Sequence, residues 1–162
     1  MRRVAVKILF VCKHNSCRSI LAEAIGKRFL PPKFEVVSGG SDPTGELHPF
    51  VQQYLKDMGL NAKDYHSKSW EEFVHFHPDI VISVCDIQHG EQGPNWLADG
   101  VRVYWHLNNP MDFVDDETQF EEQCHLASVS MKKRIDNLAA CNFENMTHQE
   151  MHDELERIGL IG

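Results

Sequence analysis

Five residues separate Cys12 from Arg18 near the N-terminus, and a thiol and a guanidinium are groups that could act together on an oxyanion. They lie between an apolar run that predicts a strand and a segment with helical periodicity. The N-terminus of a helix presents backbone N–H groups and partial positive charge, which bind anions. A guanidinium adds a bidentate fork for a tetrahedral oxyanion, and the same field lowers the pKa of a nearby thiol. The segment therefore predicts a Cys12 thiolate placed to attack a bound oxyanion.

Two neighbouring side chains fit this interpretation. Asn15 tolerates a positive φ and can hydrogen-bond within the loop, and Ser19 can donate a hydrogen bond to the Cys12 sulfur. The alternative is structural: Cys12 is a small residue that ends a strand, and Arg18 is a solvated helix charge. The strand before the segment and the helix after it favour the oxyanion site.

Strands alternate with helices along the rest of the chain. The expected strands are 4–11, 34–38, 79–84 and 101–107, and the expected helices are 19–30, 49–58, 117–140 and a short one near the C-terminus. The alternation predicts a single α/β domain over residues 1–162, a three-layer α/β/α fold with a four-stranded, mostly parallel sheet. Ligands of such sheets bind beyond the carboxyl ends of the strands, which means the loops after Val11, Val84 and Leu107.

Local signals predict how the helices begin, end and pack. Thr147 and Glu150 have the form of a capping box, and Gly159 is expected to act as a C-cap. Ser69 is expected to cap a short helix. The long helix is expected to bury an apolar face made of Leu126, Val129, Ile135 and Leu138.

Composition limits the classes of partner. The chain has 162 residues, and 16 basic against 24 acidic residues give a net charge of −8, which disfavours nucleic acid and anionic membranes as partners. No apolar run is long enough to span a membrane or to form a secretory signal, so we expect a cytoplasmic protein. Five cysteines are too few for a disulfide scaffold, and free thiols in a reducing compartment are either buried or reactive.

The segment from Val11 to Ala24, VCKHNSCRSILAEA, resembles the signature of the low-molecular-weight protein tyrosine phosphatase superfamily. Its Asn-Ser-Cys-Arg-Ser core is most similar to the thiol-dependent arsenate reductases. The likeness continues in SGGSDPTGELHP (38–49), SKSWEEF (67–73) and DIVISVCD (79–86).

This resemblance implies a phosphatase-like fold and a two-thiol mechanism. Cys12 would attack arsenate, while the oxyanion would be held by the loop residues Lys13, His14, Asn15, Ser16, Cys17 and Arg18, with Ser19 assisting. Cys85 matches the second thiol, which would release arsenite. Thioredoxin, or glutathione with glutaredoxin, would then reduce the resulting disulfide, and no bound cofactor is implied.

Three positions depart from the family pattern. Gly93 precedes Pro94 where thioredoxin-coupled members carry a further cysteine, which favours a small external thiol such as glutathione as the reductant. Asn109 stands before Pro110 where the superfamily has a general-acid aspartate, and an amide cannot donate a proton as an acid. His14 replaces a small residue, so it can narrow the pocket or add a cation.

Other functions remain open. The same loop suits a low-molecular-weight phosphatase that hydrolyses phosphomonoesters through a phosphocysteine, although Asn109 disfavours this. A third possibility is a catalytically weakened oxyanion-binding protein. Cys17, Cys124 and Cys141 are expected to be structural, and no metal site is expected because the histidine pairs lack further ligands.

Overall fold

The computed structural model describes residues 6–84 and 95–162. Its sheet has the order β2-β1-β3-β4, and every pair of neighbouring strands is parallel. The prediction of a four-stranded parallel sheet is therefore confirmed. The strands are β1 (Val6–Cys12), β2 (Phe34–Gly40), β3 (Ile80–Ser83) and β4 (Val101–Tyr104).

The helices follow the predicted order. The α-helices of the described residues are α1 (Arg18–Phe29), α2 (Pro49–Asp57), α3 (Glu117–Ala139) and α4 (His148–Gly159). The same residues also form the short 3-10 helices η1 (Ala62–Asp64), η2 (Trp70–Phe73), η3 (Asn95–Asp99) and η4 (Pro110–Phe113). Ser69 caps η2 by accepting a hydrogen bond from the backbone N–H of Glu71, as predicted. Within the described parts of the chain, no helix has the length and apolarity needed to cross a membrane.

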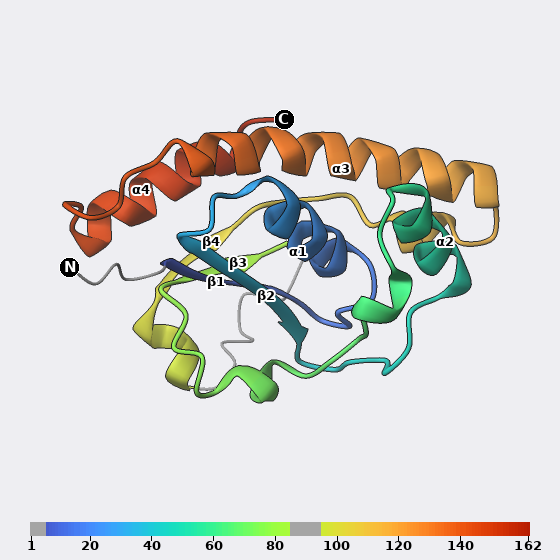
Figure 1. Cartoon of the computed structure of the whole chain (residues 1–162), viewed down its shortest axis with the longest axis horizontal. Coiled ribbons are helices and arrows are strands. Elements are labelled where there is room, and N and C mark those ends of the chain that lie inside the picture. The colour runs from blue at the N-terminus through green and yellow to red at the C-terminus, as the bar shows by residue number, and fades with distance from the viewer. Residues whose placement is uncertain (1–5, 85–94) are drawn as a thin grey trace.

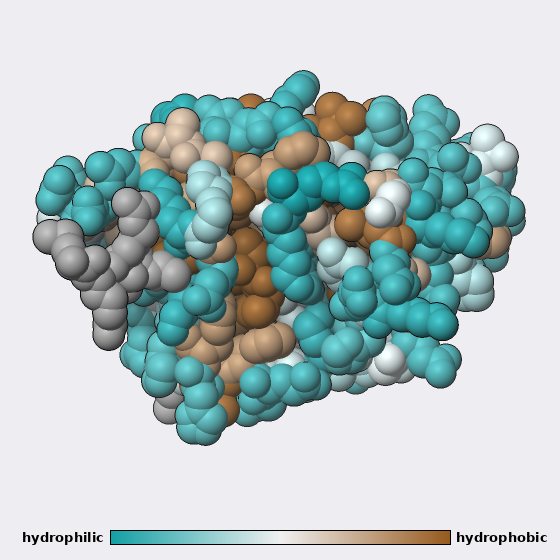
Figure 2. Space-filling view, in the orientation of Figure 1, coloured by the Kyte–Doolittle hydropathy of each residue, from teal (hydrophilic) through white to brown (hydrophobic). Residues whose placement is uncertain are grey.

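Alternate residues of β1 enter two different layers of the core. Ile8 and Phe10 pack on the side covered by α1, α3 and α4, which lie together above the sheet in Figure 1. Leu9 and Val11 face the other way, toward the residues of η2 and η3. Since both faces of the strand are covered, it reads as a continuous apolar run. Figure 2 shows an apolar band across the middle of one face, with hydrophilic residues on both sides.

The buried face of α3 differs from the predicted one. Leu126 and Val129 are 54% and 40% exposed, so their assignment to the apolar face was wrong, whereas Ile135 and Leu138 are buried as expected. The helix, which contacts α1 and η4 most, buries instead a stripe with alternating spacings of four and three residues: Phe120, Cys124, Ala127, Met131, Arg134 and Leu138.

The C-terminal helix is anchored on β4. Thr147 and Glu150 form the predicted capping box at its start, since each side chain bonds the other's backbone N–H. The expectation that Gly159 is the C-cap was wrong. Gly159 is the last helical residue, and Leu160 caps the helix in a right-handed conformation. The absence of a side chain at Gly159 makes room for Trp105, which follows β4.

The sheet register brings the carboxyl ends of the strands to one edge. Cys12 pairs with Gly40, Val11 pairs with Ser83, and Ser83 pairs with Tyr104. β4 ends three residues before the predicted Leu107, because the backbone N–H of Trp105 makes the last bond to β3, at the Ser83 carbonyl. The loops that leave this edge form the candidate site.

Candidate active site

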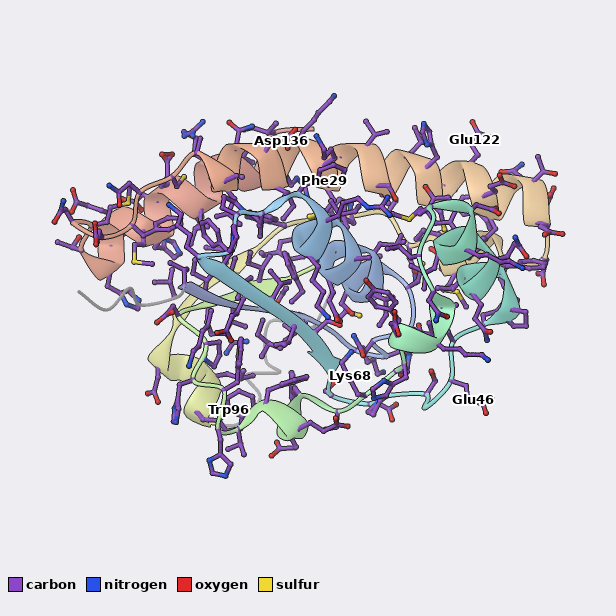
Figure 3. All side chains as sticks on the ribbon, in the orientation of Figure 1. Phe29, Glu46, Lys68, Trp96, Glu122 and Asp136 are labelled. Atoms are coloured by element: carbon purple, nitrogen blue, oxygen red, sulfur yellow. The ribbon has the colours of Figure 1, made fainter. Side chains whose placement is uncertain are left out.

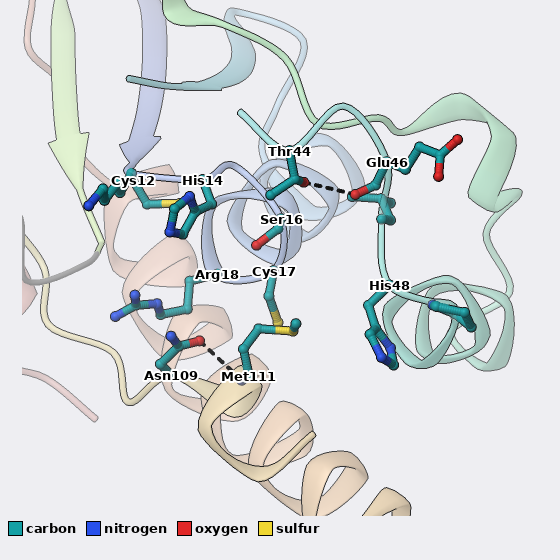
Figure 4. A pocket seen from close by; sticks show the side chains of 13 residues that line it. Cys12, His14, Ser16, Cys17, Arg18, Thr44, Glu46, His48, Asn109 and Met111 are labelled. Atoms are coloured by element: carbon teal, nitrogen blue, oxygen red, sulfur yellow. Dashed lines mark hydrogen bonds between the residues drawn. The ribbon is translucent and has the colours of Figure 1, made fainter. Parts of the chain in front are cut away.

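The segment from Cys12 to Arg18 connects the end of β1 to the start of α1. Cys12 is 4% exposed and lies in the wall of a cavity of about 410 Å³. Figure 4 shows this cavity, which is bounded by the loop, the segment before α2 and the start of η4. Its lining consists of Cys12, Lys13, His14, Ser16, Cys17, Arg18, Thr44, Glu46, Leu47, His48, Pro49, Asn109 and Met111.

The Cys12 thiol is in contact with the Ser19 hydroxyl. The Cys12 Sγ and Ser19 Oγ atoms are 2.9 Å apart, in the buried floor of the loop. Ser19 Oγ also accepts a hydrogen bond from Asn15 Nδ2 at 2.8 Å. Between the neutral groups either atom can be the donor, but a Cys12 thiolate carries no hydrogen, so the Ser19 hydroxyl is then the donor to the sulfur. That arrangement stabilises the negative charge of a thiolate.

Asn15 is fully buried and holds the loop in an unusual backbone conformation. Its φ is +47°, in the left-handed region that asparagine tolerates. Its Oδ1 accepts the backbone N–H of Lys68 at 2.9 Å, and its Nδ2 also donates to Ser38 Oγ at 3.0 Å. These bonds fix the side-chain amide, which in turn orients Ser19.

The Arg18 side chain is held in place by a hydrogen bond to the loop after β4. Its Nη1 donates a hydrogen bond to the Leu107 carbonyl, 3.1 Å away, in the loop after β4. Since a guanidinium carries five N–H donors, others remain to contact an anion in the cavity. Figure 4 shows the side chain between Cys12 and Asn109. The guanidinium is therefore held at the cavity wall by an element remote in sequence.

The two residues after Cys12 are exposed and basic. His14 Nδ1 lies 3.0 Å from the Asp42 carbonyl oxygen, and the His14 carbonyl accepts a hydrogen bond from Ser67 Oγ at 2.7 Å. Lys13 and His14 both line the cavity. Lys13 and Arg18 give the mouth positive character. Glu46 is the acidic member of the lining, and its carboxylate points away from the cavity in Figure 4.

Cys17 turns toward α3. A hydrogen bond to Cys124 and complete burial raise the pKa of the Cys17 thiol well above its usual value. Both side chains pack in the apolar cluster between α1, α2 and α3. Because the thiolate is the nucleophilic form, the raised pKa disfavours reaction of Cys17 at neutral pH despite its place beside the cavity.

Asn109 occupies the cavity wall opposite the loop. Its Oδ1 caps η4 by accepting the backbone N–H of Met111 at 3.1 Å. A carboxylate at this place would fit the same capping geometry. The amide contributes hydrogen-bonding groups to the cavity and no acidic proton.

Cys85, the matching candidate for the second thiol, lies outside the described residues, as do Gly93 and Pro94. The described chain leads to this point from β3. The backbone N–H of Val84 donates to the Val11 carbonyl at 3.0 Å, one residue from Cys12.

The sequence analysis did not identify three buried polar residues that lie behind the loop: Glu23, Ser38 and Lys68. They come from α1, β2 and the segment before η2. A buried ion pair between positions 45 residues apart leaves no local pattern in the sequence. Among the described residues, no group of three or more histidine, cysteine or acidic side chains could hold a metal ion.

Comparisons with known proteins agree with this geometry. A glutaredoxin arsenate reductase from Synechocystis sp. is 30% identical over 134 residues, which are 83% of this chain and 96% of that protein. A solved arsenate reductase from Archaeoglobus fulgidus has a TM-score of 0.65 and 26% identity, covering 80% of this chain and 98% of its own.

A low molecular weight protein tyrosine phosphatase from T. tengcongensis shares the fold, with a TM-score of 0.64, 20% identity and coverage of 82% of this chain and 99% of its own. The family model for low molecular weight phosphotyrosine protein phosphatases matches residues 7–142. That match spans all of the sheet except its first residue, Val6, together with the Cys12–Arg18 loop, the cavity and all of α3. The chain therefore belongs to the low molecular weight phosphotyrosine protein phosphatase family.

Proposed function

We propose that this chain is an arsenate reductase in which Cys12 is the nucleophile. The observation that carries the proposal is the contact of the Cys12 sulfur with the Ser19 hydroxyl, at 2.9 Å, inside a cavity that Arg18 also lines. A thiol placed this way has hydrogen-bonding support for its ionised form and a cation beside its target. The 30% identity to a protein named glutaredoxin arsenate reductase supports arsenate as the oxyanion.

The chemistry begins with attack on arsenic. The Cys12 thiolate forms a sulfur–arsenic bond, and one arsenate oxygen leaves as water after protonation. Arg18 and the backbone N–H groups of residues 13–19 hold the remaining oxygens. Ser19 supports the thiolate before attack.

A second thiol completes the reduction. It attacks the Cys12 sulfur, so a disulfide bond forms while the sulfur–arsenic bond breaks and leaves its electron pair on arsenic. Arsenic becomes trivalent and departs as arsenite, and two thiols have supplied the two electrons. We assign this second thiol to Cys85 or to glutathione.

The identity of residue 109 favours reduction over phosphoester hydrolysis. Asn109 stands at the cavity wall and cannot protonate an alkoxide leaving group. General-acid catalysis contributes typically 10²–10⁴-fold, so its loss penalises phosphomonoesters with poor leaving groups. Arsenate loses only an oxygen as hydroxide or water, which is less demanding.

The reductant and the location belong to the same proposal. We propose glutathione with glutaredoxin as the reducing system, with thioredoxin as the alternative. Gly93 stands where a further redox cysteine would serve thioredoxin coupling, and a relative carries glutaredoxin in its name. We place the reaction in the cytoplasm, where these reductants act, and treat residues 1–162 as one catalytic domain.

The test is direct measurement of arsenite. The purified protein is incubated with arsenate and either glutathione plus glutaredoxin or thioredoxin with its reductase. We expect arsenite from the first system and none from Cys12→Ser, while Cys141→Ser, whose thiol is outside the cavity lining, keeps full activity. Loss of turnover in Cys85→Ser assigns the second thiol to Cys85, and retained turnover assigns it to glutathione. Absence of arsenite with both systems would falsify the proposal.

The cavity volume keeps phosphomonoester hydrolysis as a second candidate. About 410 Å³ leaves room for an organic group beside the oxyanion, toward His48 and Met111. Hydrolysis of p-nitrophenyl phosphate that survives Cys85→Ser but not Cys12→Ser would favour this function. Thermal stabilisation by oxyanions without turnover of either substrate would identify a binding protein instead.

A further inference from the structure

Lys68 is a buried lysine behind the oxyanion loop. Its side chain is 9% exposed and lies near the carboxyl end of β2 (Figure 3). Four oxygen atoms surround the ammonium within hydrogen-bond distance. They are Ser38 Oγ and the His66 carbonyl at 3.2 Å, Glu23 Oε1 at 3.3 Å and Asn15 Oδ1 at 3.4 Å.

The charge of this lysine is balanced inside the fold. Glu23 is 4% exposed and accepts hydrogen bonds from Lys68 and Ser38 on one carboxylate oxygen. Its other oxygen accepts a bond from Lys27, 2.6 Å away, whose side chain is half-exposed. A buried charge is tolerated when it is paired and hydrogen-bonded in this way. The ion pair thus keeps a cation in a largely buried position behind the loop.

A directed chain of donors leads from this cation to the thiol. Lys68 donates to Asn15 Oδ1, Asn15 Nδ2 donates to Ser19 Oγ, and the Ser19 hydroxyl faces Cys12 Sγ. The first two bonds point their hydrogens toward Ser19, and when Cys12 is a thiolate, which can only accept, the Ser19 hydroxyl donates the third to the sulfur. Hydrogen bonds arranged head to tail polarise one another. A cation at the donor end of the chain therefore strengthens the last hydrogen bond, which stabilises an anion at the other end.

We propose that Lys68 is a positioning residue that acts through Asn15 and Ser19 to stabilise the Cys12 thiolate. This inference rests on the proposed nucleophilic role of Cys12. Lys68 does not line the cavity and touches no substrate there. Its contribution is electrostatic and orienting, exerted from behind the loop.

The backbone N–H of Lys68 allows the orientation of the Asn15 amide to be tested separately from the charge of the Lys68 side chain. This N–H also donates to Asn15 Oδ1, at 2.9 Å, and we expect that backbone bond to persist when the side chain is changed. Lys68→Met therefore keeps the amide orientation while it removes the cation. Lys27→Met is the matched control, because it removes the other ammonium on Glu23 and leaves Asn15 and Ser38 untouched. Arg18, Lys13, His14 and His48, the basic residues at the cavity, are present in every variant.

The experiment measures alkylation of Cys12 by iodoacetamide as a function of pH, with the modified site located by mass spectrometry. It needs no arsenate, so its result is independent of whether arsenate is the substrate. We expect Lys68→Met to raise the apparent pKa of Cys12 by about 1 and to slow alkylation near pH 7 about tenfold. Lys27→Met is expected to match the wild-type profile.

A folded Lys68→Met protein with the wild-type profile would overturn the proposal, as would an equal shift in Lys27→Met. Lys68→Gln is the second variant, and it decides the matter if the methionine variant fails to fold. Glutamine is neutral but retains N–H donors, so we expect its profile to shift in the same direction. An unchanged profile in a folded Lys68→Gln protein also overturns the proposal.

Discussion

Gly159 of α4 lies directly against the indole of Trp105: a Cβ atom at Gly159 would come within 2.5 Å of Trp105 Cδ1. The same indole donates its Nε1–H to the Leu155 carbonyl at 2.9 Å, one turn earlier in the helix. The ring is thus fixed from two sides, and its position sets how closely α4 approaches the end of β4. The contact joins an element beyond the family match to the strand whose following loop carries Asn109.

Gly159→Ala is expected to destabilise the protein by about 1–3 kcal/mol, because the added methyl group overpacks against the fixed indole. Urea unfolding measures the difference. Gly26→Ala is the control, since a Cβ there meets the Val36 side chain at 3.2 Å and the gain in helix propensity offsets the crowding. Equal stability of Gly159→Ala and wild type would contradict the contact.

Two leucines near the end of the chain test how firmly α4 belongs to the core. Leu155 is fully buried, whereas Leu160 is 89% exposed. We expect Leu155→Ala to cost about 2–5 kcal/mol of unfolding free energy and Leu160→Ala less than about 0.5 kcal/mol. A small effect at both positions would mean that α4 is not packed as described.

The Cys17 thiol makes stability depend on pH in alkaline solution. Its pKa is raised in the folded protein by the hydrogen bond to Cys124 and by burial, so the native state keeps a proton that the unfolded chain releases near pH 8.5. The stabilisation is complete below that pH and is lost as pH rises toward the folded pKa. Between pH 9 and 10 the unfolding free energy should fall faster than in Cys17→Ala, by up to about 1.4 kcal/mol per pH unit.

Both proteins in this comparison carry Cys12→Ser, so the nucleophile does not contribute to the difference. Guanidinium unfolding at a series of pH values gives the two curves. Parallel curves above pH 9 would show that Cys17 titrates normally.

Asn109→Asp should increase phosphomonoester hydrolysis. Aspartate is as good a helix cap as asparagine, so η4 is expected to keep its start, while the carboxyl group adds a proton donor at the cavity wall. With phenyl phosphate, a substrate with a poor leaving group, we expect a gain of roughly 10- to 100-fold that declines as pH rises through the pKa of the new acid.

Asn108→Asp is the matched control, because it adds the same charge next door at an exposed position outside the cavity lining. Steady-state kinetics of both variants separate acid catalysis from a general effect of charge. An equal gain in the two variants would exclude acid catalysis by residue 109.

The sheet could be predicted from the sequence because its central strands are covered on both faces. Such strands read as unbroken apolar runs, as in β1 and β3, and their order along the chain indicates parallel pairing. The Cys12–Arg18 loop could be predicted because it lies between one of these strands and a segment with helical periodicity.

The face of α3 could not be predicted, because its buried stripe includes residues that do not read as apolar. Arg134 lies in the stripe and is 6% exposed, and its guanidinium bonds the carbonyls of His106 and Ile161 at 2.9 Å. Cys124 and Ala127 are small and give a weak signal. The larger Leu126 and Val129 suggested a different buried face, but in the folded protein both side chains are exposed.

The buried partners of the oxyanion loop could not be predicted from the sequence for a related reason. Lys68 and Glu23 look like surface charges in the sequence, and only the fold brings them together at 3.3 Å. The signal in the sequence was limited to Asn15 and Ser19, which lie within the loop and the first turn of α1.

Because the Leu107 carbonyl braces Arg18, the guanidinium needs little reorganisation to receive an ion. A braced guanidinium and backbone N–H groups recognise charge and tetrahedral shape, and phosphate shares both with arsenate. Discrimination between the two ions therefore has to arise after capture, since thiols reduce pentavalent arsenic while phosphorus stays pentavalent. We therefore expect phosphate to compete with arsenate for the site, and its dissociation to limit the rate of arsenate turnover when phosphate is in excess.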